Sequence, residues 1–175
     1  MKFTPFPNLS TERLSLRQIN SGDENEIFLL RSDERVLEFI DIAKAETVED
    51  AAKFIDKINI NIANNESIMW AICLKDSPIL IGNICFWNII KEELIAEIGY
   101  SLLPEFQGRG IMQETVTKVI EYGFETMHLN SIVADLDPQN IKSIKLLERN
   151  AFIYTGKSQE DDLLVYTLKN PRQSL

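Results

Sequence analysis

The feature that most constrains this sequence is a glycine-flanked junction between an expected strand and an expected helix. Residues 94–103 are mostly apolar and suited to a strand, and Pro104 ends that run. Between residues 112 and 127 apolar side chains recur at helical spacing, which predicts a helix of about five turns. Gly108 and Gly110 fall where this helix begins. A strand, a short turn and a helix therefore meet at these two glycines.

The start of such a helix offers backbone N–H groups without an acceptor in the helix and carries roughly half a positive charge. Glycines let a ligand approach those donors closely because they have no side chain. Residues 107–112 therefore predict an anion site, most simply for phosphate or pyrophosphate. The alternative is a plain turn in which the glycines serve only the backbone geometry. A phosphate loop of the G-x-x-x-x-G-K-S/T type is absent, and Gln113 stands where a dinucleotide fingerprint needs its third glycine.

Length and composition predict one domain that spans residues 1–175. The apolar content of 45% and the charged content of 26% are ordinary for a soluble globular protein. Residues 1–8 contain two prolines and no apolar run, so we expect no signal peptide. No stretch is long and apolar enough for a membrane span. These features favour a cytoplasmic protein without a membrane partner.

The charge balance and the metal-binding residue types argue against two further classes. A net charge of −9 argues against a nucleic-acid partner, which would need a concentrated basic face. The same charge suits a cationic substrate, although solubility alone also accounts for it. His128 is the single histidine, and Cys73 and Cys85 lie in apolar runs typical of buried thiols. We therefore expect no metal site and no disulfide.

Alternation and helical spacing along the chain predict a mixed α/β sheet of about seven strands with about four helices. Residues 131–136 should lie parallel to the strand that holds Glu97, because a helix crosses over between them. Thr47 and the pair Asp137-Pro138 fit helix starts. The expected strands are residues 11–17, 68–74, 79–89, 94–103, 131–136, 152–154 and 163–168. The expected helices are residues 23–35, 47–62, 110–127 and 137–149.

Three ordered segments resemble one known family. The string Gln107–Met112 is similar to the acetyl-coenzyme A signature Q/R-x-x-G-x-G/A of the GNAT N-acetyltransferases, with methionine in place of the final small residue. Residues 11–17, T-E-R-L-S-L-R, are like the opening of the RimJ/RimL branch, the ribosomal-protein N-acetyltransferases. Residues 140–152 match the region N-x-x-S-x-x-L-x-x-x-x-G-F, with Ala151 at the usual glycine. The order of these segments makes the resemblance specific, and it implies the GNAT acyl-CoA N-acyltransferase fold.

The resemblance implies acetyl-coenzyme A (acetyl-CoA) as the cosubstrate and no metal. Main-chain N–H groups of the glycine turn would bind the pyrophosphate, and the amide-like pantetheine arm would pair with the strand edge as an added strand does. Arg109 either meets a coenzyme phosphate or is a solvated surface arginine, and Asn140 either binds the pantetheine or caps its helix. The cofactor-binding residues implied in this way are Ser101, Leu102, Leu103, Gln107, Gly108, Arg109, Gly110, Ile111, Met112 and Asn140.

Acetyl transfer to an amine also needs a base, an oxyanion donor and an acid. Glu97 is the only carboxylate inside its expected strand, and in the family resembled an acidic residue of this strand often serves as base, commonly through water. Orienting the amine and facing solvent are the alternatives for Glu97. A main-chain N–H near Leu102 is the natural oxyanion donor. Because Leu147 stands where many GNAT enzymes carry a tyrosine, Ser143 is the candidate acid, with a backbone-bonded helix serine as its alternative.

For each of three aromatic residues near these segments, the sequence allows two structural roles. Tyr100 fits a core aromatic or a residue that lines the acetyl channel. Trp70 and Trp87 lie in neighbouring expected strands and fit burial and substrate-groove lining equally well.

The sequence therefore predicts an acetyl-CoA-dependent N-acetyltransferase that works by direct attack in a ternary complex, without a covalent enzyme intermediate. By resemblance alone, the acceptor is a protein N-terminal α-amine of the ribosomal-protein kind. A small amine such as a polyamine or an aminoglycoside is the close alternative. A non-catalytic, CoA-binding regulatory module is the alternative from another class. The oligomeric state is not readable from the sequence, which is compatible with a monomer or a homodimer.

Overall fold

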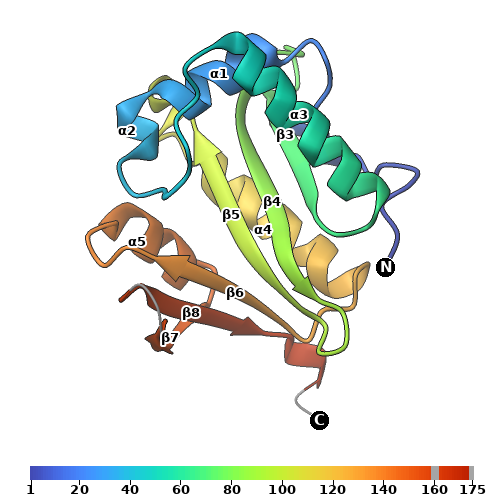
Figure 1. Ribbon diagram of the computed structural model, residues 1–175. Coiled ribbons are helices and arrows are strands. Elements are labelled where there is room, and N and C mark those ends of the chain that lie inside the picture. The colour runs from blue at the N-terminus through green and yellow to red at the C-terminus, as the bar shows by residue number, and fades with distance from the viewer. Residues whose placement is uncertain (159–161, 174–175) are drawn as a thin grey trace.

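One mixed sheet runs through the molecule (Figure 1). The structure, a computed structural model, describes residues 1–158 and 162–173. Within these ranges eight strands lie in the order β1-β2-β3-β4-β5-β6-β8-β7. β5 pairs with β6 in parallel, and the other neighbouring pairs of this described sheet are antiparallel. The strands are β1 (Leu9–Ser10), β2 (Leu14–Gln18), β3 (Ile68–Leu74), β4 (Leu80–Ile90), β5 (Ile95–Leu102), β6 (Ser131–Leu136), β7 (Ile153–Lys157) and β8 (Leu164–Lys169).

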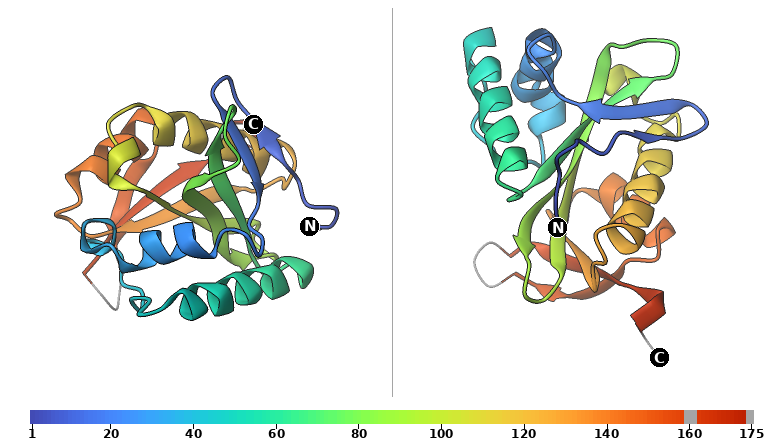
Figure 2. Two further views of the ribbon diagram at one scale, coloured as in Figure 1. Left: turned by 90° about the horizontal axis from the view of Figure 1, so that it is seen from above. Right: turned by 90° about the vertical axis from the view of Figure 1, so that its right-hand side faces the viewer.

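Helices cover both faces of the sheet. Figure 2 shows α1 and α3 on one face, with α4 and α5 on the other. In the described part of the chain, no helix combines the length and the apolar character that crossing a membrane requires. The helices are α1 (Glu24–Ser32), α2 (Glu34–Leu37), α3 (Val48–Ala63), α4 (Ile111–Glu125) and α5 (Ile141–Arg149), with short 3₁₀ turns at Pro104–Phe106 and Pro171–Gln173.

The expected α/β class and the parallel β5–β6 pair are confirmed, and β7 pairs with β8 in antiparallel. The described residues hold one more strand and one more helix than the pattern predicted. The additional strand is β1, which is only two residues long and therefore too short to show alternation. The helix expected over residues 23–35 divides at Asp33, because that residue is extended and its side chain accepts a hydrogen bond from the Arg35 N–H as the N-cap of α2.

Helix starts were predicted correctly at α3 and wrongly at α5. At α3, Thr47 and Asp50 exchange hydrogen bonds with each other's backbone N–H groups, forming a capping box. At α5, Asp137 does not cap the helix, because its Oδ1 accepts from the Gln139 N–H at 2.7 Å and closes a local turn. The N-cap is Asn140, and α5 begins three residues later than the pattern of Asp and Pro suggested.

Trp70 is a core residue and does not line a groove. Its side chain is fully buried, and its Nε1–H donates to the Pro7 carbonyl at 2.7 Å. The ring makes edge contacts with Phe86 and Tyr122, at centroid distances of 6.3 and 5.3 Å. Trp87, by contrast, is 48% exposed. Of the two tryptophans, only Trp87 is therefore available to a ligand.

Helix α4 packs on the sheet through a glycine. A Cβ atom on Gly123 would lie 2.9 Å from Phe86 Cζ and 3.2 Å from Leu129 Cδ1. Both neighbours are fully buried. Because interiors are close-packed, this position tolerates no added side chain without movement of the Phe86 ring.

We expect Gly123→Val to lower the free energy of unfolding by about 1–3 kcal/mol, the usual cost of overpacking a core. The measurement is urea denaturation of the variant and the wild type. Glu121→Ala, an exposed position on the same helix, is the matched control and should change stability far less. A Gly123→Val protein as stable as the wild type would show that α4 does not pack on Phe86 as described.

Candidate active site

The central feature of the site is a fork in the sheet between β5 and β6. Their parallel pairing covers Ile95–Glu97 on β5 and Ser131–Val133 on β6, and it ends there. Beyond Glu97, β5 stays paired with β4, while β6 stays paired with β8. The two strands diverge from this point (Figure 1). The last part of β5 therefore presents a strand edge without a strand partner.

Only every second residue of β5 directs its backbone N–H and C=O groups to the open edge. Leu103 donates its N–H to the Ile81 carbonyl on β4 at 2.9 Å. Because backbone groups of successive strand residues point to opposite edges, those of Leu103 and Ser101 face β4, and those of Tyr100 and Leu102 face the fork. The Leu103 N–H is therefore engaged with β4, and the edge that faces the fork carries the backbone groups of Tyr100 and Leu102. The binding of a pantetheine arm at Ser101 and Leu103 stays a prediction.

A turn with bare amides follows β5 and leads into α4. Gly108 and Gly110 both adopt φ of +74°, a left-handed conformation that glycine accepts without strain, and Gly110 is the N-cap of α4. In the described ranges, the N–H groups of residues 108–113 have no hydrogen-bond acceptor. This is the arrangement expected for an anion site.

Gln107 supports the turn and does not present its own amide. Its N–H donates to the Pro104 carbonyl at 3.2 Å, and its side-chain Nε2 donates to the Leu102 carbonyl at 3.0 Å. The predicted row of bare amides therefore begins one residue later, at Gly108. Arg109 is exposed to solvent. Its Cζ atom lies 5.7 Å from the centroid of the Phe106 ring.

Glu97 lies at the fork with a pKa suited to proton transfer near neutral pH. Burial and, second, the charge of Asp135 raise the pKa of Glu97 from its ordinary 4.5 to about 7, against the lowering effect of a hydrogen bond from Asn88. Trp87 is the cross-strand partner of Glu97 on β4. A half-buried carboxylate with this pKa is partly ionised at pH 7 and can accept a proton from an amine.

Asp135 lies close enough to Glu97 to affect its pKa, and the sequence analysis did not identify it. Glu97 pairs with Val133, and Asp135 lies two residues further along β6, so the three side chains share one face of the sheet. Burial raises the pKa of Asp135 as well. The sequence predicted that β5 and β6 are parallel neighbours. It did not predict which residues of the two strands lie side by side, and placing Asp135 near Glu97 requires that register.

A hydroxyl pair lies on the opposite face. The Tyr100 hydroxyl is 2.8 Å from Ser143 Oγ, and Ser143 stands in the first turn of α5. Burial raises the pKa of Tyr100 to about 12, although the hydrogen bond with Ser143 opposes that rise. Leu147, at the position of the family tyrosine, is fully buried. The sequence analysis proposed Ser143 as the acid but did not place the Tyr100 hydroxyl beside it.

Two other predicted site residues have structural partners. Asn140 Oδ1 accepts the Ser143 N–H at 3.1 Å, so its side chain serves as the helix cap. Ser101 Oγ donates to Asn83 Oδ1 at 3.2 Å. Met112 packs against the hydrophobic core, and its N–H is one of the bare amides.

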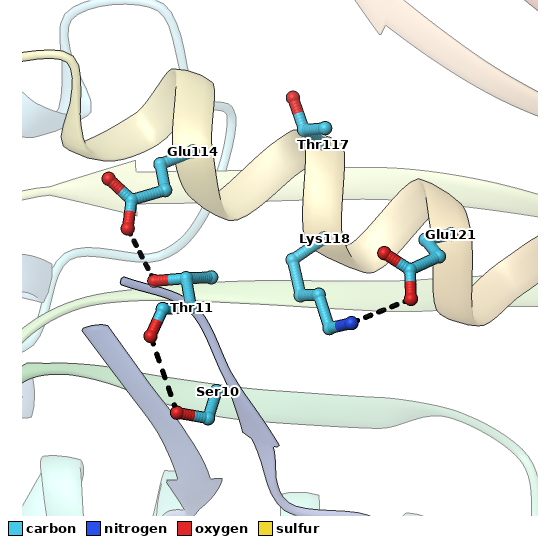
Figure 3. A pocket seen from close by; sticks show the side chains of 6 residues that line it. All are labelled: Ser10, Thr11, Glu114, Thr117, Lys118 and Glu121. Carbon is cyan, nitrogen blue, oxygen red and sulfur yellow. Dashed lines mark hydrogen bonds and ion pairs between the residues drawn. The ribbon is translucent and has the colours of Figure 1, made fainter. Parts of the chain in front are cut away.

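A shallow hollow of about 370 Å³ lies beside α4 (Figure 3). Its lining shares no residue with the fork and consists of Ser10, Thr11, Glu114, Thr117, Lys118 and Glu121. Among the residues that the structure describes, no group of three or more His, Cys, Asp or Glu side chains is placed to hold a metal ion.

Comparisons with known proteins agree with this architecture. A model of the acetyltransferase (GNAT) domain matches residues 13–153. The uncharacterized N-acetyltransferase YoaA of Bacillus subtilis (strain 168) is 32% identical over 176 residues, which cover 96% of this chain and 99% of that protein.

Two solved structures show the likeness of fold. The ribosomal-protein-S5-alanine acetyltransferase from Vibrio fischeri aligns with a TM-score of 0.82 at 23% identity, covering 94% of this chain and 97% of that one. The spermidine N-acetyltransferase from Vibrio cholerae, in complex with CoA and spermine, aligns with a TM-score of 0.81 at 20% identity, covering 91% and 96%. From the domain match and the relative that spans nearly its whole length, this chain belongs to the GNAT family of N-acetyltransferases.

Proposed function

We propose that this chain transfers the acetyl group of acetyl-CoA to a protein N-terminal α-amine by direct attack in a ternary complex. The observation that carries the proposal is Glu97, a carboxylate with a pKa of about 7 placed where β5 and β6 part. An α-amine has a pKa of about 8, so most of it arrives as ammonium and must lose a proton before it can attack. Glu97 accepts that proton, directly or through a water molecule.

The glycine turn and the open edge of β5 each suit one part of the cosubstrate. The N–H groups of residues 108–113 suit a diphosphate, and the edge groups of Tyr100 and Leu102 suit the amides of a pantetheine arm. When bound, acetyl-CoA supplies the acetyl group as a reactive thioester. The Leu102 N–H faces the fork and is the donor for the carbonyl oxygen as negative charge develops on it.

The hydroxyl pair provides the acid. Because the pKa of Tyr100 is raised to about 12, its hydroxyl keeps its proton at neutral pH. Either hydroxyl can donate in this 2.8 Å contact; in the mechanism proposed, Tyr100 is the donor, which leaves the Ser143 proton free to turn toward the fork. Ser143 then gives that proton to the leaving thiolate. Base and acid thus act from opposite faces of the sheet.

The choice of acceptor rests on two kinds of support. The T-E-R-L-S-L-R segment resembles the ribosomal-protein branch, and the exposed Trp87 ring beside Glu97 offers an apolar surface for the residue that follows an N-terminal amine. A small polyamine is the second candidate, because Asp135 supplies a second carboxylate next to Glu97 and would suit a second cationic group.

The direct test is release of free thiol from acetyl-CoA across a panel of acceptors. We expect turnover with peptides that have a free N-terminal amine, and at most slow turnover with spermidine or aminoglycosides. Glu97→Gln should lower kcat by about 100-fold or more, the lower range of general-base catalysis. Glu93→Gln, an exposed residue in the preceding turn, is the control and should retain full activity. Coenzyme binding without turnover on any amine would favour the non-catalytic module.

Asp135→Asn should shift the pH dependence of kcat/KM. Glu97 works as a base in its ionised form, so activity rises with pH through its pKa, about 7 in the wild type. Removing the Asp135 charge lowers that pKa, and the rise moves to lower pH. It stays above pH 4.5, because burial is the larger cause of the shift. An unchanged profile in Asp135→Asn would contradict the coupling between the two carboxylates.

Removing the acid should slow the reaction without weakening coenzyme binding. We expect Ser143→Ala to lower kcat by at least about tenfold, within the reach of general-acid catalysis. Tyr100→Phe should lower kcat less, because it removes only the orienting hydrogen bond. The double variant should match Ser143→Ala, since residues that act through one another are not additive. Additive losses in kcat would show that Tyr100 and Ser143 act separately.

A further inference from the structure

The segment that leads into β2 is bound to the first turn of α4 through Glu114. Thr11 Oγ1 donates to Glu114 Oε1 (Figure 3). The Arg13 N–H donates to the same oxygen at 3.0 Å, and Arg13 Nε donates to Oε2 at 2.7 Å. These three donors occupy both oxygens of a carboxylate that lies four residues after the N-cap, Gly110.

The same arginine also reaches the glycine turn. Arg13 Nη1 donates to the Arg109 carbonyl at 3.1 Å. Arg13 Nη2 lies so close to Gly110 that a Cβ there would be 3.5 Å from it. One guanidinium therefore joins Glu114 to the turn whose amides are bare. We call these three residues, Thr11, Arg13 and Glu114, the clamp.

The clamp bears on how accessible the bare amides are to an anion. An acidic side chain in the first turn of a helix is attracted to the positive end of the helix, where a bound anion would also lie. A Glu114 carboxylate free to turn back would repel a diphosphate or compete with it for the N–H groups. Although burial raises the pKa of Glu114, the hydrogen bonds from Thr11 and Arg13 outweigh it and lower the pKa overall, so the group stays ionised and paired.

We propose that Arg13 is a positioning residue for coenzyme binding: it holds the Glu114 carboxylate away from the amides of residues 108–113 and fixes the Arg109 carbonyl so that these amides face outward. This inference rests on the proposed function for the identity of the anion, a coenzyme diphosphate. Arg13 also brings a positive charge to the turn, which favours the bound anion.

A second arginine pair on the same helix provides a matched control. Arg172 Nη2 donates to Glu125 Oε1 at 2.8 Å, at the opposite end of α4. Both pairs join an Arg side chain to a Glu of α4, and both are partly exposed. Exposed ion pairs of this kind contribute little to stability, so neither substitution should unfold the protein. Arg172→Gln should leave coenzyme binding unchanged.

The experiment is calorimetric titration of the wild type and the variants with coenzyme A, together with the KM for acetyl-CoA, kcat and the melting temperature of each protein. We expect Arg13→Gln to raise the Kd and this KM by about tenfold or more, with kcat at saturation within about twofold of the wild type. Arg13→Lys should also bind weakly, because one ammonium group cannot reach both Glu114 and the Arg109 carbonyl as a guanidinium does. The double variant Arg13→Gln/Glu114→Gln should recover part of the lost affinity, since the carboxylate that interferes is gone.

The outcomes separate this inference from the proposed function. If the wild type binds coenzyme A and Arg13→Gln binds it equally well, the inference is wrong and the proposed function stands. If the double variant is no better than Arg13→Gln, the claim that Arg13 restrains an interfering carboxylate is wrong. If the wild type binds neither coenzyme A nor inorganic pyrophosphate, both the inference and the proposed function fail.

Discussion

The parallel pairing of β5 with β6 ends at Glu97, and the geometry of the candidate site follows from that limit. Beyond that point β5 stays paired with β4, and β6 stays paired with β8. The hydrogen bonds missing at the fork are therefore those between β5 and β6. The Tyr100 backbone groups and the Leu102 N–H are left over, while the Leu102 carbonyl accepts from Gln107 Nε2. Such unpaired groups are what an amide-bearing ligand needs. Strand alternation then places Glu97 on one face of the fork and the Tyr100–Ser143 pair on the other. A base and an acid can therefore approach one reacting group from two sides.

The anion site depends on keeping amides unpaired in a chain rich in acceptors. Three polar side chains near the turn are held by contacts elsewhere, although Gln113 Oε1 is buried without a hydrogen-bond partner among the described residues. Gln107 is bonded to the Leu102 carbonyl, Gln113 donates to Asn150, and Glu114 is held by Thr11 and Arg13. Both glycines are left-handed; a Cβ on Gly108 would meet no atom within 4 Å, whereas one on Gly110 would lie 3.5 Å from Arg13 Nη2. The site is thus formed as much by contacts around the turn as by the turn itself.

Local patterns predicted the parts of the site that lie close together in the sequence, and long-range contacts determined the rest. The strand, the glycine turn and the helix over residues 94–127 follow from apolar spacing and from Pro104 and the glycines, which act over a few residues. Asp135 could not be placed beside Glu97, because that requires the register between two strands. The clamp joins residues about a hundred positions apart, so the T-E-R-L segment showed only a family resemblance.

The central claim is that the amides of residues 108–113 bind the coenzyme diphosphate, and amide-resolved NMR tests it most directly. Proton–nitrogen correlation spectra are recorded while coenzyme A is added to the protein. Charge-assisted hydrogen bonds to phosphate should move the amide protons of Gly108 to Gln113 downfield, with the largest shifts in the protein, and should slow their exchange with solvent. If coenzyme A saturates the protein while these six signals stay in place, the account is wrong.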